Sequence, residues 1–544
     1  MSARGPRSRR ARELLVVAGF TALMAAPFLG QALVSDEPSN LAAAEHILKD
    51  PLHPYAFRYA WFGRELPFDQ TSNNPPLYHY LLAAARGAVG RGEFALRLAM
   101  LPLSIAAALS LYLIAERFLA EPLLPVLVVT AGPAWALNLE HLMGEQGAAA
   151  FGLAGLATLL SALNDGPPAL FWLSALLLDA SLLCKYHAAL FLPPAAAWAW
   201  SRSVKPARLA AYLAVAGAGL ALYLAADARF GGVAFSGARE TMAFVARFPT
   251  SALSHRARAL LAFAGGCGAA ASLWPLRARR PSLAAATAAL AAAAVLFSPP
   301  LDLAPGPNSL DRMTGIAFAA AALWAYAVVW TQRRRPGGVL WTAWAASATA
   351  FSAAYWSVTT RVELFVLPPL ALASAAALET GVGARERRRL YALSLAATAA
   401  LTLALGIVDR HFADAQKEFA ARLKADYLDK GRRVWYTGGM ALGDELSRAG
   451  GQGLDAARGG WDLARPGDAV VVARINSAGL RPAHPIRARV TAEILDEPIP
   501  LRLISAGESE AGFYSSVWGF LPFALSLEPL EEFTIVEPLG DGAR

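Results

Sequence analysis

Long apolar blocks follow one another along most of the chain and are separated by short polar or basic segments. Each block approaches the roughly 20 residues that an α-helix needs to cross the hydrocarbon core of a bilayer. The first block is Leu14–Val34, and the others lie at about 95–115, 122–139, 145–163, 168–184, 185–201, 207–226, 257–275, 281–298, 312–331, 338–357, 361–379 and 390–408. The pattern predicts a polytopic α-helical membrane protein with about 13 transmembrane helices.

The blocks 168–184 and 185–201 are contiguous, so the same residues also fit one long helix or a bent hairpin. Merging them would reverse the orientation of every later block. Basic residues would then change sides along the second half of the chain, contrary to the usual concentration of Lys and Arg on one side of a membrane. We therefore expect two separate spans.

Basic residues mark alternate connections between the blocks. If the arginine-rich segment Met1–Glu13 lies inside, the predicted inner connections contain Arg117; Arg202, Lys205 and Arg208; Arg277, Arg279 and Arg280; Arg333–Arg335; and Arg385 with Arg387–Arg389. An excess of Lys and Arg in short loops is typical of the cytoplasmic side. We expect a multi-pass protein of the inner (plasma) membrane, with a cytoplasmic N-terminus and an extracytoplasmic C-terminal domain.

Composition supports this class of protein. The chain is 56% hydrophobic and 17% charged, as membrane proteins are. The net charge of +8 does not indicate nucleic-acid binding, because the basic residues lie between the apolar blocks rather than on one face. The first block also resembles a signal peptide, but its length and the absence of a small-x-small site before Asp36 predict an uncleaved span.

Two parts differ in character. Residues 1–409 form the predicted transmembrane domain, with a large first outer loop at 35–94, and residues 410–544 contain short segments rich in Val and Ile. We expect the latter to be an extracytoplasmic α/β domain. Its Gly438-Gly439 pair is interpreted as a strand-to-helix turn rather than a nucleotide site. Its aromatic stretch 512–522 either docks the domain onto the membrane part, which we favour, or stacks on sugar.

The first outer loop begins with Asp36 and Glu37, directly after the first span. Two adjacent carboxylates at a membrane boundary require solvation, a cationic partner or a bound cation. One of them can also cap the helix predicted at Pro38–Lys49. A second, amphipathic helix is expected after Asn74, which would be its cap, with Pro75 in its first turn.

Four segments in order resemble a known enzyme family. They are Asp36-Glu37 with Asn74-Pro75-Pro76-Leu77-Tyr78, then Glu93–Leu98, then Leu183–Ala188 around Lys185, and finally Thr360–Pro369 around Arg361. Together they resemble membrane glycosyltransferases of the C type (GT-C), related to protein O-mannosyltransferases and lipid A aminoarabinose transferases. The chain departs from that family at Glu145, where relatives usually carry an aspartate, and at Val362, where they usually carry a tyrosine.

The resemblance implies a GT-C fold and a polyprenyl-phosphate sugar donor. Transfer to an acceptor hydroxyl needs a base, and Asp36 is the candidate, with Glu37 beside it. The departing lipid phosphate needs cations, for which Lys185 and Arg361 are the candidates. Each of these two also fits a simple interfacial anchor. The remaining candidate substrate-binding residues are Asn74, Tyr78, His79 and Glu145, although an interfacial or packing role is the more common one for histidines such as His79.

No cofactor is certain, and a divalent metal ion held by Glu37 and Glu145 is an option, because carboxylates suit hard cations. The predicted function is an inverting glycosyltransferase acting at the outer face of the membrane. Its partners are a polyprenyl-phosphate-linked sugar, the lipid bilayer and an acceptor glycan, lipid or protein, with no nucleic acid. The alternatives are a transporter or flippase of a lipid-linked substrate and a catalytically silent scaffold.

Overall fold

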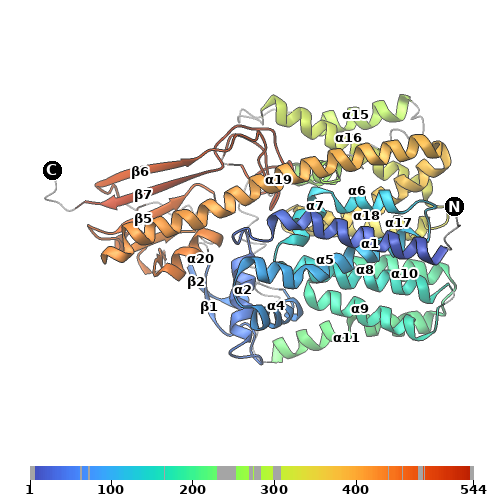
Figure 1. Cartoon of the computed structure of the whole chain (residues 1–544), viewed down its shortest axis with the longest axis horizontal. Coiled ribbons are helices and arrows are strands. Elements are labelled where there is room, and N and C mark those ends of the chain that lie inside the picture. The colour runs from blue at the N-terminus through green and yellow to red at the C-terminus, as the bar shows by residue number, and fades with distance from the viewer. Residues whose placement is uncertain are drawn as a thin grey trace.

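The computed structural model shows a bundle of roughly parallel helices with a smaller sheet-containing domain at one end (Figure 1). The N-terminus lies at the opposite end of the bundle. The structure describes residues 6–61, 64–71, 74–164, 166–229, 253–268, 274, 283–297, 308–438, 440–455, 458–475, 482, 484–505 and 507–539. The predicted fold class, a helical membrane protein with a C-terminal α/β domain, is confirmed.

Helices occupy each of the predicted spans. They are α1 (Pro6–Ala25), α5 (Glu93–Ala115), α6 (Leu123–Thr130), α7 (Pro133–Glu140), α8 (Gly144–Ala162), α9 (Ala169–Cys184), α10 (Leu192–Ser201), α11 (Pro206–Arg229), α13 (Leu253–Gly266), α15 (Leu283–Leu296), α16 (Ser309–Gln332), α17 (Gly338–Ala354), α18 (Thr360–Gly381) and α19 (Ala384–Asp426). Among the described residues, six helices are long and apolar enough to cross a membrane, or seven if the α6–α7 pair, bent by 62°, is one span. The count of about 13 stays a prediction.

Lys185 separates the two contiguous apolar blocks. It ends α9 in an extended conformation with φ −162° and ψ 135°, and the 3-10 helix η2 (Tyr186–Phe191) then leads into α10. A residue in the β region cannot continue an α-helix. The two blocks therefore form separate helices, and their assignment as two membrane spans stays a prediction.

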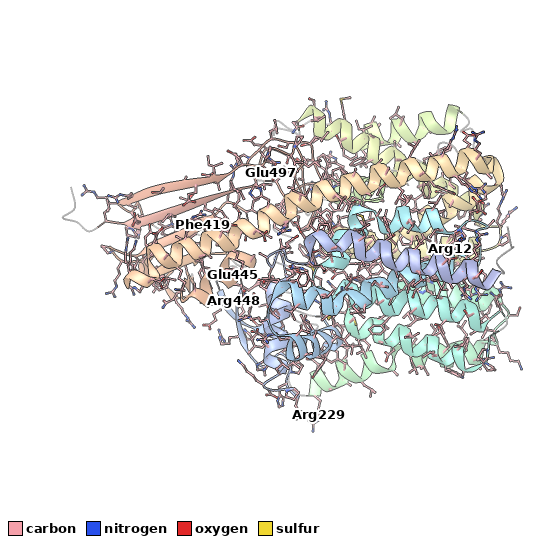
Figure 2. All side chains as sticks on the ribbon, viewed as in Figure 1. Arg12, Arg229, Phe419, Glu445, Arg448 and Glu497 are labelled. Atoms are coloured by element: carbon pink, nitrogen blue, oxygen red, sulfur yellow. The ribbon has the colours of Figure 1, made fainter. Side chains whose placement is uncertain are left out.

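The end of the bundle that contains the N-terminus is rich in ion pairs. Arg10 binds Glu116 after α5, at 2.6 Å, and Glu121 binds both Arg387 and Arg388 of α19. Arg12 lies at this end, far from the domain that carries Phe419 and Arg448 (Figure 2). The basic connection at Arg277, Arg279 and Arg280 and most of the outer connections 227–256 and 299–311 lie outside the described residues.

The first outer loop contains more structure than the two predicted helices. It comprises α2 (Glu37–Ile47), the antiparallel strands β1 (Arg58–Trp61) and β2 (Arg64–Pro67), α3 (Phe68–Thr71) and α4 (Leu77–Val89). The hairpin was not predicted, because Arg58–Pro67 lacks a clear alternation of apolar and polar residues. Asn74 is not the cap of α4 as expected, because that helix begins at Leu77, after Pro76.

The C-terminal domain is built on a five-stranded sheet in the order β4-β3-β5-β7-β6. The strands are β3 (Val434–Thr437), β4 (Gln452–Gly453), β5 (Ala469–Ala473), β6 (Ala488–Leu495) and β7 (Glu531–Pro538), with β3 parallel to β4 and β5. The helix α20 (Met440–Ala449) follows β3. The Gly438-Gly439 interpretation lies partly outside the described residues, and Gly438 has φ 102°.

The last bundle helix continues into this domain. The predicted span ended near Asp409, whereas α19 runs on to Asp426 and links the bundle to the sheet (Figure 1). Phe419, Ala420 and Leu423 of this extension are buried in the core formed with β3, β5 and β7. The predicted domain boundary at 409/410 thus lies within a continuous helix, which joins the two parts rigidly.

The aromatic stretch near the C-terminus docks onto the bundle. The Phe513 carbonyl accepts hydrogen bonds from the Thr360 amide at 3.1 Å and the Thr360 hydroxyl at 2.8 Å. The Ser516 amide donates to the Val358 carbonyl at 2.8 Å. Phe513 and Tyr514 are buried, so their rings provide packing area in this arrangement. These contacts hold the start of α18 in place.

Candidate functional site

Asp36 lies at a sharp turn between the first span and α2. The preceding residue, Ser35, has φ 52°, in the left-handed region that side chains other than glycine rarely adopt. Asp36 then takes the N-cap position of α2, but its side chain makes no capping hydrogen bond. The carboxylate instead forms an ion pair with Arg361, so the capping alternative does not describe this residue.

Arg361 comes from the second position of α18, 325 residues further along the chain. Its Nη1 atom binds Asp36 Oδ2 and also lies 3.5 Å from the sulfur of Met143. Only 11% of the Arg361 side chain is exposed. A guanidinium anchoring a helix at the lipid–water boundary would extend into solvent, whereas this one points at a carboxylate inside the protein.

A second ion pair joins Glu145 and Lys185. Glu145 is in the first turn of α8, and Lys185 is the extended residue that ends α9. The Lys185 ammonium binds Glu145 Oε1, and the other carboxylate oxygen, Oε2, is buried without a hydrogen-bond partner among the described residues. Exposed fractions are 10% for the Lys185 side chain and 1% for that of Glu145. A buried carboxylate oxygen without a donor is unusual in a native structure, and this oxygen is still able to accept a hydrogen bond.

The two ion pairs belong to one electrostatic cluster. Arg361 Nη1 lies 3.5 Å from the sulfur of Met143, two residues before Glu145, so both ion pairs meet at the segment 143–145. Asp36 is the most exposed member, with 28% of its side chain accessible. All four side chains belong to helix ends or turns at the end of the bundle that carries the outer loop. Asp36 is therefore the member of the cluster nearest to solvent, and Glu145 is the most deeply buried one.

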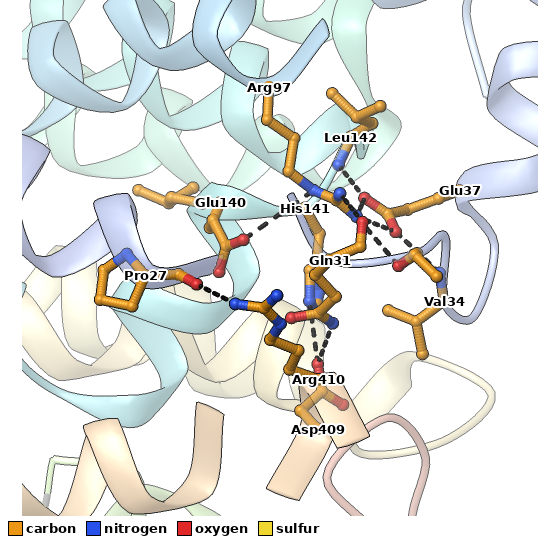
Figure 3. Close-up of polar contacts among 12 residues, drawn as sticks. Pro27, Gln31, Val34, Glu37, Arg97, Glu140, His141, Leu142, Asp409 and Arg410 are labelled. Carbon is orange, nitrogen blue, oxygen red and sulfur yellow. Dashed lines mark hydrogen bonds and ion pairs between the residues drawn. The ribbon is translucent and has the colours of Figure 1, made fainter. Parts of the chain in front are cut away.

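Glu37 is separated from this cluster although it follows Asp36 directly. Its carboxylate binds the buried Arg97 of α5 at 2.7 and 2.9 Å and accepts main-chain hydrogen bonds from Val34 at 2.8 Å and Leu142 at 2.7 Å (Figure 3). Both side chains are fully buried. These contacts fix the turn before α2 against the loop between α7 and α8, so the geometry gives Glu37 a supporting position rather than one at the reacting groups.

A further buried network lies beside Arg97. Asp409 of α19 accepts from Gln31 at 2.8 Å and from the Tyr514 hydroxyl at 2.5 Å, and it lies 3.2 Å from His141 Nε2. Figure 3 shows Gln31, His141 and Asp409 converging from separate segments. The network connects the end of the first span, the α7–α8 loop and the C-terminal aromatic stretch. Its hydrogen bonds hold these three segments against one another.

The other predicted site residues lie close by in the first outer loop. His79 is buried, its Nε2 lies 3.0 Å from Asn40 Oδ1, and its Nδ1 lies 2.9 Å from the Tyr55 hydroxyl. Burial lowers the pKa of His79 to about 3, so its ring is neutral at physiological pH. Tyr78 is also buried, with its hydroxyl 3.4 Å from Gln146 Oε1. The Asn74 carbonyl accepts a hydrogen bond from Tyr55 at 2.8 Å.

The two candidate metal ligands, Glu37 and Glu145, each pair with a basic residue. Glu37 is neutralised by Arg97, and Glu145 is neutralised by Lys185. Within the part of the chain that the structure describes, no three His, Cys, Asp or Glu side chains gather in a way that could hold a metal ion. Each of the two carboxylates is thus already compensated by its own basic residue.

Arg97 and Asp409 were missed as site residues. A charged side chain inside an apolar helix is a signal in its own right, because such residues are costly unless paired. Arg97 stands in such a helix, but its position near the start of α5 fits an interfacial anchor equally well. Asp409 directly follows the apolar block 390–408, a position that indicates the end of a span rather than a site.

Comparisons with known proteins give a distant structural likeness. No family model matches the chain, and none of the curated proteins matches it. A crystal structure of ArnT from Cupriavidus metallidurans bound to undecaprenyl phosphate is similar at 12% identity and a TM-score of 0.49, covering 86% of this chain and 93% of that chain. The structure of the same protein in the apo state gives 14% identity, a TM-score of 0.44, and coverages of 84% and 92%. A function for this chain therefore has to rest on its own side chains and not on these two structures.

Proposed function

We propose that this chain is an inverting glycosyltransferase that moves a sugar from a polyprenyl-phosphate donor to an acceptor at the outer face of the membrane. One observation carries the proposal. Asp36, Arg361, Glu145 and Lys185 come from four separate segments and form one cluster of two carboxylates and two cations. Such a cluster supplies both a base for an incoming hydroxyl and positive charge for an outgoing phosphate.

Donor binding changes the partners within the cluster. A phosphate that approaches from the exposed Asp36 side competes for Arg361, whose planar guanidinium matches phosphate as well as carboxylate. Arg361 then binds the phosphate, and the Asp36 carboxylate is released from its ion pair. Lys185 adds a second positive charge and stays aligned through Glu145. Before the donor arrives, Asp36 and Arg361 are each other's partners in the ion pair.

The reaction is a single displacement at the anomeric carbon. Asp36 removes the proton of the acceptor hydroxyl while the acceptor oxygen forms its bond to the anomeric carbon. The bond from that carbon to the phosphate oxygen breaks, and its electron pair leaves with the polyprenyl phosphate. Arg361 and Lys185 stabilise the added negative charge. Attack opposite the leaving group inverts the anomeric centre.

The position of the cluster favours an enzyme over a transporter. Transporters of lipid-linked substrates hold ionisable residues near the membrane midplane, at broken helices. Here Glu145 and Arg361 lie in the first turns of their helices, and Asp36 lies directly before α2, the helix that follows the first span. We assign this end of the bundle to the extracytoplasmic side, because the basic connections lie at the other end.

Asp36→Asn tests the proposal. Purified protein in liposomes is given a labelled sugar on undecaprenyl phosphate, the lipid bound in one of the similar ArnT structures, together with envelope material as the acceptor. Mass spectrometry then measures free undecaprenyl phosphate and glycosylated products. Loss of the base is expected to slow transfer by about 10²–10⁴-fold.

Asp50→Asn is the matched control, because Asp50 is a carboxylate of the same outer loop that pairs with His53 on the surface. This variant is expected to keep the full rate. Equal rates for Asp36→Asn and the unaltered chain, in protein that remains folded, would remove Asp36 as the base.

A further inference from the structure

A cavity of about 430 Å³ lies between the first outer loop and the C-terminal domain. Ala60 and Glu65 of the β1–β2 hairpin form one wall, and residues of β3, β4 and the segment after β4 form the other. An ion pair between Glu65 and Arg458 bridges the two walls. The volume is within the range of sites that bind small ligands, which is roughly 300–1,000 Å³.

The cavity lies where open α/β sheets bind ligands. Gly438 directly follows β3, and Asp455 and Arg458 follow the neighbouring parallel strand β4. Crevices outside the carboxyl ends of parallel strands are the usual ligand sites of such sheets. Gly438 has φ 102°, so its main chain turns sharply at the cavity wall without a side chain. The hairpin forms the facing wall of this crevice, which stays partly open to solvent beside the exposed Glu65–Arg458 pair.

Main-chain groups add hydrogen-bonding capacity to the wall. The strand β4 is at the edge of the sheet, and in the described part of the chain it pairs with β3 alone. Its Gly453 carries no side chain to cover the backbone. Edge strands offer unpaired N–H and C=O groups. Together with Gln452 and Ser447, these groups can donate and accept hydrogen bonds in several directions.

The lining selects against anions. Glu65 and Asp455 contribute two carboxylates, whereas Arg458 contributes a single positive charge. A phosphate-bearing ligand such as a nucleotide would meet a net negative wall. The Tyr436 ring lies beside Gly453 and supplies apolar surface next to the polar groups. Alternating hydroxyl and C–H faces, with no net charge, are the features of a neutral sugar.

We propose that this cavity binds a neutral mono- or disaccharide, the glycan part of the acceptor. The saccharide site stands on the cavity alone, and its assignment to the acceptor rests on the proposed glycosyltransferase activity. The hairpin that covers the cavity belongs to the same outer loop as Asp36. A glycan held here is therefore bound by the loop that also carries the base.

Saturation-transfer NMR on the full chain, in a detergent without a sugar headgroup, tests the site with maltose, cellobiose and N,N′-diacetylchitobiose. At least one is expected to bind saturably, and glucosamine 6-phosphate is expected not to bind.

A Cβ at Gly453 would lie 3.6 Å from the Tyr436 ring, an ordinary contact, so a larger side chain fits the backbone and fills the cavity. Gly453→Leu should weaken binding by roughly tenfold or more, and Gly453→Ala by less.

Glu532→Gln is the control, because Glu532 lies on β7 and pairs with Arg474 away from the cavity. It should bind sugar as the unaltered chain does, and melting curves verify that the Gly453 variants remain folded. Absence of saturable binding by all three disaccharides, or equal binding in folded Gly453→Leu, would overturn the saccharide site. Transfer assays separate the two proposals: saturable sugar binding by a folded, unaltered chain that transfers no sugar from the polyprenyl-phosphate donor would overturn only the enzymatic one.

Discussion

Asp36 and Glu37 are adjacent in the chain yet bind different arginines, Asp36 pairing with Arg361 and Glu37 with Arg97. Successive side chains at the start of a helix point about 100° apart, so neighbours can face different parts of the protein. Asp36 faces the partly open cluster, with 28% of its side chain exposed, whereas Glu37 is fully buried. The two carboxylates look equivalent in the sequence, but their substitution is expected to have different effects: on stability for Glu37 and on sugar transfer for Asp36.

Glu37→Gln should destabilise the protein. It removes the charge that compensates the buried Arg97, and breaking a buried ion pair on one side costs about 3–5 kcal/mol. Thermal unfolding in detergent is expected to show a clearly lower melting temperature for Glu37→Gln. Asp36→Asn should change the melting temperature little, because Arg361, the partner of Asp36, is nearer to solvent than Arg97. Equal melting temperatures for the two variants would contradict the supporting position assigned to Glu37.

Arg361→Lys should weaken donor use while the protein keeps its fold. Lysine retains the charge but cannot bind phosphate through two parallel hydrogen bonds. The KM for the polyprenyl-phosphate donor is expected to rise about tenfold, and Arg361→Ala should raise it further and lower kcat. Steady-state kinetics with donor and acceptor varied separately measure this.

Arg410→Ala is the control for that series, since Arg410 is a half-exposed arginine of the same end of the bundle that pairs with Asp414. Arg410→Ala should leave the donor KM and kcat unchanged. If the Arg361 variants changed the acceptor constant as strongly as the donor constant, contact with the phosphate would be the wrong explanation.

Lys185 and Glu145 should behave as a coupled pair. Lys185→Met leaves the Glu145 carboxylate buried without a partner, which costs several kcal/mol. The double variant Lys185→Met/Glu145→Gln removes both charges and should recover much of the stability, without recovering transfer. Thermal unfolding of the unaltered chain, Lys185→Met, Glu145→Gln and the double variant gives the coupling energy between the two side chains. Strictly additive losses of stability would show that they act independently.

Much of the bundle could be predicted because span length and hydropathy are local properties of the sequence. Residues such as those of α5, α16 and α18 are apolar for the whole thickness of a bilayer. The arrangement of the first outer loop could not be predicted in the same way. Its β1–β2 hairpin contacts the C-terminal domain through Glu65 and Arg458, and no local pattern reveals such a long-range contact.

The candidate site was predicted in part, for a similar reason. Asp36, Lys185 and Arg361 could be named from motifs, but the sequence did not indicate that Glu145 would pair with Lys185 or that Glu37 would turn to Arg97. Pairing depends on where helices 40–325 residues apart meet. Asp409 was hidden because a polar residue after an apolar block resembles the end of a span, whereas α19 continues for another four turns or so.

Cysteine labelling should place the C-terminal domain outside the cell. Ser516, an obvious first position in the aromatic stretch, is buried and unsuitable. Leu527 has 73% of its surface exposed, and Arg334 is exposed at the other end of the bundle. Leu527→Cys should react with a membrane-impermeant maleimide in intact cells, and Arg334→Cys only after permeabilisation. The native Cys184 and Cys267 are buried and give little background; the reverse labelling pattern would invert the assigned orientation.

Glu531 should make the stability of the C-terminal domain depend on pH. Its Oε1 accepts main-chain hydrogen bonds from Ile475 and Glu532, each at 2.9 Å, while Oε2 is buried without a partner among the described residues. Burial raises the pKa of Glu531 to about 8, above its ordinary value of 4.5. Between these two pH values the folded state holds a proton that the unfolded state has lost.

Stability should therefore fall as the pH rises through this window, by at most about 1.4 kcal/mol per pH unit from this group, because unfolding releases a proton there. Glu531→Gln keeps the two accepted hydrogen bonds and removes the titration, so its melting temperature should depend less on pH and exceed that of the unaltered chain near pH 8. Glu532 is the next residue along the strand, and about a third of its side chain is exposed. The melting temperature of Glu532→Gln should therefore depend on pH as that of the unaltered chain does. Parallel pH profiles for the unaltered chain and Glu531→Gln would mean that the Glu531 carboxyl is already ionised in the folded domain.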